Sequence, residues 1–373
     1  MSPARLARRL LTLAAASLAL PALVAVAAPA RADGTGGWTP KTPPLTTPWT
    51  SKVTTHPLPE YPRPQLTRPR WQNLNGVWQF AAATGADQPP PVGRDLAERI
   101  LVPYPVESAL SGIMRHEQRM WYRRTFTVPP SWRVGTGADR LLLHFGAVDH
   151  QATIWVNGVQ VGSHQGGYDA FTVDVTAALH GHGPQELVVG AYDPTDGGDQ
   201  PVGKQRNDPG GIFYTPTSGI WQTVWMEPTP ALHIDRLDTT PDLVTNTLRL
   251  TVQASGAAGA GATVEATASA GGHVVGRATG RPGAEIRVPV PHATLWSPDH
   301  PFLYDLTVRL RSDRGTDQVG SYFGMRSIGL ATGRDGMLRP VLNGRFVFQV
   351  GTLDQGFWPD GIYTAPTDDA LRF

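Results

Sequence analysis

Short runs of alternating apolar and polar residues dominate the chain from Trp71 onward, separated by turn residues about every 8–12 positions, as in sandwiches and barrels. In residues 138–163, Leu141–Phe145 and Ala152–Val156 are predicted strands. Asn157-Gly158 between apolar runs predicts a hairpin turn, because both residues tolerate a positive φ. The pattern therefore predicts an all-β protein.

Two further runs extend this first set of strands. Residues 171–176, FTVDVT, place Phe171, Val173 and Val175 on one face of a strand. Ile220–Glu227, IWQTVWME, is predicted to form another strand.

A second set of strands follows the boundary at Pro228-Thr229-Pro230. Residues 247–256 place Leu248, Leu250 and Val252 on one face, and residues 302–310 alternate in the same way. About 100 residues of short alternating strands indicate an immunoglobulin-like sandwich, here without its cysteine pair.

The pattern changes again near the C-terminus. After a hairpin at Asn343-Gly344, Phe346–Leu353 is apolar almost without alternation, which is typical of a strand buried on both faces of a parallel sheet. Pro366–Asp369 predicts a helix start, with Thr367 as N-cap and two acids in the first turn. Without neighbouring strands, residues beyond about Arg339 are expected to be loosely held.

Composition narrows the functional classes. The 373 residues carry a net charge of +1, which does not indicate binding to nucleic acid or an anionic membrane. The absence of cysteine excludes disulfides, thiol catalysis and cysteine-ligated metal. A basic–aromatic stretch, Arg115–Arg124, could suggest a nucleic-acid patch, but a strand with solvated arginines and a buried Trp121 explains it better.

The N-terminus predicts export. Arg5, Arg8 and Arg9 precede an apolar run, and Ala30-Arg31-Ala32 has the small-x-small pattern of a cleavage site. We expect residues 1–32 to be a signal peptide cleaved near Ala32, giving a secreted, extracellular protein; the twin-arginine route stays open beside the general one. The proline-rich residues 33–65 are expected to form an extended lead-in.

Eight sequence motifs between residues 66 and 360 resemble those of glycoside hydrolase family 2, the β-galactosidase, β-glucuronidase and β-mannosidase group. In family order they read RPRWQNLNGVWQF, ILVPYPVESALSG, RMWYRRTFTVP, HQATIWVNGVQVGSHQGGYDAFTVDVT, SGIWQTVWME, LWSPDHPFLYDLTV, FGMRSI and LNGRFVFQVG. The resemblance implies a jelly-roll sugar-binding domain over 66–229, an immunoglobulin-like β-sandwich over 230–330, and the first strand and helix start of a TIM barrel over 331–373. It also implies that the chain ends early in that barrel.

The chemistry of that family needs two catalytic glutamates. Family members carry both on late barrel strands, the acid/base after an asparagine, whereas this chain has no Asn-Glu pair and its last glutamate is Glu285. No catalytic residue, cofactor or metal site is therefore assigned. The expected partner is carbohydrate, the terminal sugar of a glycoside.

Three residues are candidates for contacting that sugar. Asp196, with Gly197, matches an Asp-Gly that in some members reaches a sugar hydroxyl from a long loop; a solvated turn aspartate is the alternative. Trp358 and Asp360 lie in FWPDGIY after the predicted barrel strand, where an aromatic ring could stack on a pyranose. Packing of Trp358 against the sandwiches is the alternative. Residues 350–356 lack the R-G-x-N-x-H-E run of galactosidase-type members.

Two hypotheses of function follow. The first is the N-terminal part of a secreted, retaining glycoside hydrolase whose catalytic pair lies outside this chain. The second is a stand-alone secreted carbohydrate-binding or adhesion module.

Overall fold

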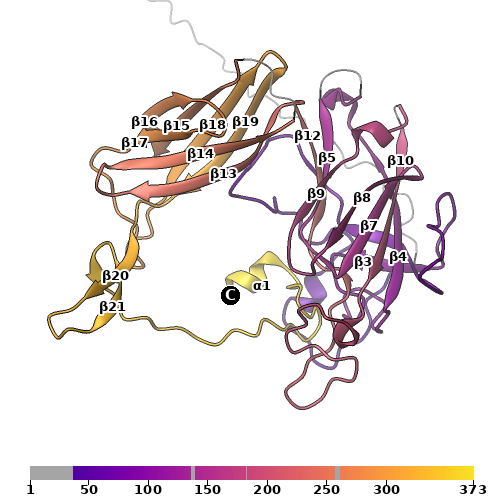
Figure 1. Cartoon of the computed structure of the whole chain (residues 1–373). Helices are drawn as coiled ribbons and strands as arrows, with labels where there is room; N and C mark the ends of the chain where they lie inside the picture. The colour runs from indigo at the N-terminus through magenta and orange to yellow at the C-terminus, as the bar shows by residue number, and fades with distance from the viewer. Residues whose placement is uncertain (1–36, 136–138, 182, 257–260) are drawn as a thin grey trace, which may run out of the picture. The chain divides into compact units, whose positions relative to one another are not determined.

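The computed structural model describes residues 37–135, 139–181, 183–256 and 261–373. The predicted signal peptide, residues 1–32, lies outside the described residues. The regular secondary structure of the described residues consists mainly of β-strands, as predicted (Figure 1).

The first set of strands forms a jelly-roll sandwich of antiparallel sheets. The strand order in the four-stranded sheet is β1 (Gln72–Asn73), β12 (Val224–Thr229), β5 (Arg140–Phe145) and β9 (Phe171–Asp174). The order in the six-stranded sheet is β3 (Glu98–Val102), β2 (Gly76–Ala82), β4 (Arg119–Thr127), β10 (Pro184–Tyr192), β7 (Gln151–Val156) and β8 (Val159–Gln165). A short pair joins β6 (Val148–Asp149) and β11 (Gly219–Ile220).

Alternation explains the core of this sandwich. Val173 and Val175 are buried while the residues between and beside them are exposed or partly so. Trp78, Phe80 and Tyr122 are fully enclosed in the same core. The predicted hairpin is confirmed, because β7 pairs with β8 through Asn157 and Gly158, both with positive φ.

The second set of strands forms the immunoglobulin-like sandwich. Its three-stranded sheet orders β13 (His233–Asp242), β14 (Thr247–Ser255) and β17 (Glu285–Pro289), and its four-stranded sheet orders β16 (His273–Gly280), β15 (Thr263–Ala270), β18 (Tyr304–Ser312) and β19 (Gly315–Phe323). The inward residues of β14 and β18 predicted from alternation, such as Leu250 and Val308, are fully buried. The exact limits of both sandwiches stay predictions.

Two predicted strands differ from the structure. The strand predicted over Ile220–Glu227 is interrupted at Trp221–Thr223, because β11 pairs with β6 whereas β12 pairs with β5. At the break, the Trp221 side chain turns away from the ladder and donates to the Gly167 carbonyl oxygen at 2.7 Å.

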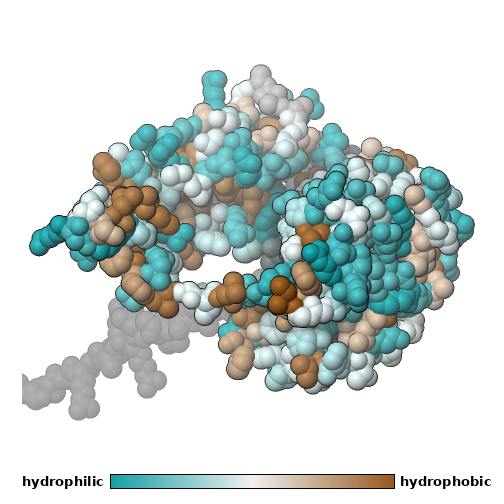
Figure 2. All heavy atoms as spheres, turned by 60° about the horizontal axis from the view of Figure 1, so that its bottom comes forward, coloured by the Kyte–Doolittle hydropathy of each residue, from teal (hydrophilic) through white to brown (hydrophobic). Residues whose placement is uncertain are grey.

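The strand predicted over Phe346–Leu353 is wrong. A three-stranded sheet joins β20 (Ile328–Thr332), β21 (Leu338–Leu342) and β22 (Arg345–Phe346), and the chain then continues without a ladder. In the described residues no parallel strand lies beside it. Its apolar side chains stay exposed, among them Phe348, Val350 and Leu353, and apolar (brown) atoms are visible on the molecular face in Figure 2.

Residues 358–370 are mostly packed, contrary to the expectation that the whole tail is loosely held, whereas Leu371 and Phe373 are exposed. Thr364 Oγ1 donates to the carbonyl oxygens of Pro103 and Trp221, and Tyr104 Oη donates to the carbonyl oxygen of Pro366. The predicted helix start is confirmed as α1 (Asp368–Arg372), with Thr367 accepting from the amide of Ala370.

Four short 3-10 helices lie in the described segments outside the strands: η1 (Thr50–Lys52), η2 (Pro130–Trp132), η3 (Thr176–Ala178) and η4 (Thr195–Gly197).

The lead-in lies along the jelly roll. Trp38 Nε1 donates to the Ser111 carbonyl oxygen, and the Lys41 amide donates to that of Ala109.

Candidate functional site

Asp196 lies within η4 and faces its own loop. Its Oδ1 accepts hydrogen bonds from the amide (3.1 Å) and side-chain nitrogen (2.6 Å) of Asn207. Its Oδ2 lies 3.7 Å from Arg206. Asp196 therefore links the beginning of this loop to residues 206 and 207 near its end. Its contact with sugar stays a prediction.

The segment that carries Trp358 and Asp360 forms a tight turn on the jelly roll. The backbones of Trp358 and Ile362 exchange two hydrogen bonds, which closes the turn. Asp360 is fully buried, and its Oδ2 accepts from Thr50 Oγ1 at 2.5 Å. The carboxylate thus faces the lead-in, and the roles proposed for Trp358 and Asp360 in sugar binding stay predictions.

Five aromatic rings gather beside this turn. We call Tyr168, Tyr214, Trp221, Phe357 and Tyr363 the aromatic cluster. Trp221 lies 5.6 Å from Tyr363 and 6.1 Å from Tyr168, and Phe357 lies 5.1 Å from Tyr214, between ring centroids. Tyr168 is 45% exposed and Phe357 38%, so part of the cluster faces solvent.

Sequence reasoning named the segment of Phe357 and Tyr363 but missed its three jelly-roll partners. Trp221 was hidden inside a predicted strand, and Tyr168 and Tyr214 stand in loops without periodicity. An interrupted strand exposes a tryptophan that a continuous one would pack, so the interruption is what places Trp221 in the cluster.

Polar groups hold the aromatic cluster in place. Gln205 Nε2 donates to Tyr168 Oη at 2.9 Å, and Gln205 itself is buried. The Tyr214 amide donates to the Lys204 carbonyl oxygen, and the Arg206 amide donates to that of Tyr214. The loop fastened by Asp196 therefore positions Gln205 and Tyr214.

Three carboxyl groups are buried beneath this face: Glu107, Asp149 and Asp193, here called the carboxyl cluster. Burial, assisted by the charges of Asp193 and Glu107, raises the pKa of Asp149 to about 8. At neutral pH Asp149 is therefore mainly protonated and can donate a hydrogen bond. A Cβ on Gly167 would overlap the Asp149 carboxyl group, so a larger residue there would displace this carboxyl group.

The other two carboxyl groups accept hydrogen bonds. Asp193 accepts from Ser218 Oγ at 2.6 Å and from the Thr195 amide at 2.7 Å. Glu107 lies 2.8 Å from His116 Nδ1, and this hydrogen bond raises the pKa of His116. Exposed rings above hydrogen-bonding groups are the combination that binds the apolar face and hydroxyls of a sugar.

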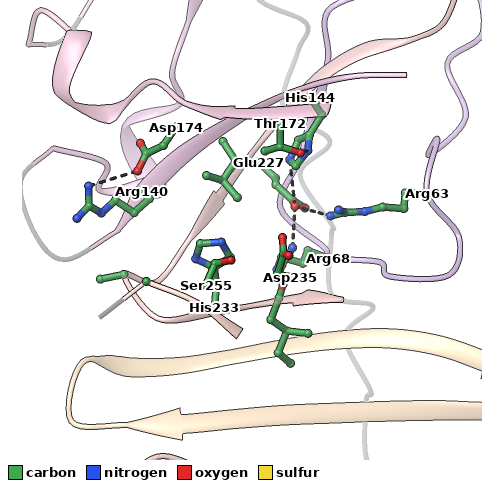
Figure 3. A pocket seen from close by; sticks show the side chains of 14 residues that line it. Arg63, Arg68, Arg140, His144, Thr172, Asp174, Glu227, His233, Asp235 and Ser255 are labelled. Carbon is green, nitrogen blue, oxygen red and sulfur yellow. Dashed lines mark hydrogen bonds and ion pairs between the residues drawn. The ribbon is translucent and has the colours of Figure 1, made fainter. Parts of the chain in front are cut away.

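A second polar region lies between the two sandwiches (Figure 3). Arg68 donates to Glu227 Oε1 at 2.7 Å and, in bidentate fashion, to Asp317 of β19 at 3.0 and 2.7 Å. Arg63 also donates to Glu227, at 2.8 Å. We call Arg63, Arg68, Glu227 and Asp317 the joint, because its ion pairs tie the jelly roll to the immunoglobulin-like sandwich.

His144 completes the surroundings of the joint. It stacks on Trp225 with centroids 3.9 Å apart, and its Nε2 lies 3.3 Å from Glu227 without hydrogen-bond geometry. Burial lowers the pKa of His144 to about 4, so it is neutral at pH 7. A cavity of about 350 Å³ opens beside it, and its labelled lining includes Arg140, Asp174 and His233 (Figure 3).

The described residues contain neither a group of side chains suited to a metal ion nor a membrane-spanning helix. Within residues 37–135, 139–181, 183–256 and 261–373, no three His, Asp or Glu side chains are grouped to hold a metal ion. No helix in these ranges has the length and apolar character needed to cross a bilayer.

Comparison with known proteins identifies the family. The model of the glycosyl hydrolases family 2 sugar-binding domain matches residues 94–230, and the glycosyl hydrolases family 2 model matches residues 232–326. Together they span more than half of the chain.

Curated relatives are similar over most of this chain. A protein named β-glucuronidase from Paenibacillus borealis is 28% identical over 316 residues, covering 78% of this chain and 50% of the relative. The β-glucuronidase of Felis catus is 26% identical, covering 70% of this chain and 45% of the relative. The chain thus spans about half the length of these relatives.

Solved structures show the same architecture. Lactobacillus rhamnosus β-glucuronidase superposes with a TM-score of 0.66 at 25% identity, covering 81% of this chain and 52% of that one. The Ruminococcus gnavus enzyme in complex with D-glucuronic acid has a TM-score of 0.65 at 19% identity, covering 81% and 53%. With both sandwiches and both family models in sequence order, the chain belongs to glycosyl hydrolases family 2.

Proposed function

We propose that this chain is the N-terminal portion of a secreted glycoside hydrolase that removes a terminal sugar by cleaving an O-glycosidic bond. One observation carries the proposal: Phe357 and Tyr363 pack against Tyr168, Tyr214 and Trp221 of the sugar-binding domain. A single partly exposed face is thereby built from the jelly roll and from the segment expected to begin the catalytic barrel.

The substrate is proposed to lie on this aromatic cluster. An exposed ring such as Tyr168 can stack on the apolar face of a pyranose, while the neighbouring polar groups meet its hydroxyls. The relatives are named β-glucuronidases, so a β-linked glucuronide is the first sugar to test.

Catalysis is proposed to retain the anomeric configuration. A retaining enzyme needs two carboxyl groups about 5–5.5 Å apart, one as acid/base and one as nucleophile. The sequence from 331 to 373 contains no glutamate. We therefore propose that the pair lies outside this chain and that this chain alone lacks turnover.

Export is proposed from the N-terminal pattern alone. Cleavage after Ala32 leaves Asp33 as the first residue. N-terminal sequencing of exported protein tests this proposal, and a start at Met1 would contradict it.

The alternative is a stand-alone carbohydrate-binding module. The packing of Asp360, Thr364 and Pro366 onto the jelly roll favours it, because these residues are buried without any further domain. Both hypotheses predict sugar binding at the aromatic cluster, but only the first predicts hydrolysis.

Binding is tested by saturation-transfer NMR and calorimetry on residues 33–373 with methyl β-D-glucuronide, β-D-galactoside and β-D-mannoside. We expect Tyr168→Ala to weaken binding of the preferred sugar about two- to tenfold, on the scale of about 0.5–1.5 kcal/mol for an aromatic contact. Tyr322→Ala is the matched control, because Tyr322 is 40% exposed on the other sandwich. Equal loss in both variants, or no binding of any glycoside, would contradict the site.

Hydrolysis is tested separately. The coding region is sequenced past codon 373, and this chain is expressed together with any barrel encoded there. The extended protein should release nitrophenol from a nitrophenyl glycoside. NMR of the first-formed product should show the same anomer as the substrate. An inverted product would contradict the mechanism, and a stop codon without a barrel would favour the binding module.

A further inference from the structure

A wedge-shaped cavity opens between two strands of the six-stranded sheet. The ladder between β2 and β4 runs from Ala82↔Met120 to Gln79↔Arg123 and stops there, although β2 begins at Gly76 and β4 continues to Thr127. The strands therefore diverge, leaving a cavity of about 220 Å³ that we call the β2–β4 wedge. It is lined by Val77, Trp78, Gln79, Asp95, Arg99, Arg123, Arg124 and Thr125.

Arg124 enters the wedge as a cation without a carboxylate partner. Its Nη1 donates to the carbonyl oxygens of Leu74 and Asn75, and its Nε donates to that of Thr125. Its guanidinium lies 5.4 Å from the ring centre of Trp78. Among the described residues no Asp or Glu oxygen lies within ion-pair distance of it.

Burial lowers the pKa of Arg124 to about 10, which still leaves the side chain charged at neutral pH. A desolvated cation held only by neutral carbonyl groups is costly to bury, and an anion beside it offsets that cost.

Arg99 brings an unsatisfied donor to the wedge. Its Nη1 donates to the carbonyl oxygens of Leu96 and Glu98, but its Nε is buried and has no hydrogen-bond partner in the described chain. The carboxylate of Glu98 is engaged by Arg115 instead, at 2.5 Å.

Arg123 is already compensated. It lies 2.5 Å from Glu186 and 3.0 Å from Asp95. The lining of the wedge therefore holds three cations and one anion, with Glu186 supplying a second anion from outside the lining. Arg123 and Arg124 belong to the Arg115–Arg124 stretch whose arginines were predicted to be solvated, but both are half-buried.

We propose that the β2–β4 wedge binds a small oxyanion, a carboxylate or sulfate group, between Arg99 and Arg124. Guanidinium groups favour such ligands because their N–H fork matches two oxygens. The site goes beyond the proposed hydrolase function and shares no residue with the aromatic cluster. The oxyanion can be free in solution or carried by an acidic saccharide.

NMR of the arginine Nε–H signals of residues 33–373 tests the proposal directly. The protein is titrated with sodium sulfate and with sodium D-glucuronate, against sodium chloride at matched ionic strength. We expect saturable shifts of the Arg99 and Arg124 signals with at least one oxyanion. Response to both indicates a site for free oxyanions, and response to glucuronate alone indicates a saccharide carboxylate.

Variants separate binding from general charge effects. Arg99→Gln should weaken binding at Arg124 at least about tenfold, as expected for loss of a charged hydrogen bond. Arg277→Gln, at an exposed arginine on β16, should leave it unchanged. Arg99 is partly exposed, so this variant should fold; far-UV circular dichroism checks that.

The proposal is overturned if the shifts are linear and equal to those in chloride. It is also overturned if Arg99→Gln, folded, binds as tightly as the parent protein.

Discussion

The joint and the carboxyl cluster both bury several charged groups in the same chain, but they compensate them differently. In the joint, Arg63 and Arg68 face Glu227 and Asp317, so two cations meet two anions. In the carboxyl cluster, the described residues place only histidines at ion-pair distance: His116 lies 2.8 Å from Glu107, and His150 lies 3.9 Å from Asp149.

The pKa values report this difference. Burial alone would raise the pKa of Glu227, but the close contact with His144 and the charges of Arg68 and Arg63 hold it below its ordinary value. Asp149 has no arginine at ion-pair distance in the described chain, and its burial beside Asp193 and Glu107 raises its pKa instead. Buried charge is retained where a cation faces it and is neutralised by a proton where none does.

The largest expected effect comes from removing one side of the joint. Arg68→Ala leaves Glu227 and Asp317 buried without their shared cation, so the free energy of unfolding should fall by about 3–5 kcal/mol. Urea denaturation at pH 7 measures this. Arg249→Ala breaks an exposed ion pair with Glu285 and should barely move the urea midpoint. An equal loss of stability in the two variants would show that the joint contributes no more than an exposed ion pair.

The carboxyl cluster should respond to pH. The folded pKa of Asp149 is raised from 3.8 to about 8, so its contribution to stability is fully present below about pH 3.8 and is lost as pH rises toward 8. Each unit within that window should cost up to about 1.4 kcal/mol. Asp149→Asn, which is neutral at every pH, should remove this slope and be more stable than the parent at pH 8.5.

His116 is the control for that experiment. Its raised pKa gives a contribution that is also lost as pH rises, but only around its own titration above 6.5. The Asp149→Asn protein should keep that part. If its urea midpoint follows the parent protein at every pH, the assignment to Asp149 is wrong.

The contribution of His144 to stability should depend on pH in the opposite direction to that of Asp149. Its folded pKa is lowered from 6.5 to about 4, so its contribution is present above pH 6.5 and is lost as pH falls toward 4. In the Asp149→Asn background, the free energy of unfolding should therefore decline between pH 6.5 and 4. Adding His144→Gln should flatten that decline; an unchanged curve would place the titration elsewhere.

The smallest effect concerns the packed tail. Thr364→Val keeps the shape but removes the hydroxyl that donates to the carbonyl oxygens of Pro103 and Trp221. We expect a loss of about 1 kcal/mol. Amide exchange of Ile362, whose amide closes the turn at Trp358, should accelerate while that of Leu250 in the other core does not.

The sequence could predict the parts of the fold that local pattern determines. Alternation placed Val173 and Leu250 in cores, Asn157-Gly158 specified its hairpin, and Thr367 its helix start, because each depends on residues close in the chain. The resemblance in motif order supplied the architecture.

Contacts between residues far apart in the chain determine the structural features that the sequence pattern could not predict. An apolar run at Phe346–Leu353 does not say whether a neighbouring strand is available. The packing of Asp360 depends on Thr50, which lies 310 positions earlier. The three jelly-roll rings of the aromatic cluster likewise meet the tail through tertiary contacts alone.

The seating of the tail on the jelly roll has a consequence for biosynthesis. Tyr104 and Pro366 are 262 positions apart, so their contact must wait until nearly the whole chain has been made. During synthesis the surface around Tyr104 and Leu110 is complete long before the segment that covers it. The jelly roll therefore folds first with this surface open, and closing so long a loop is a late step.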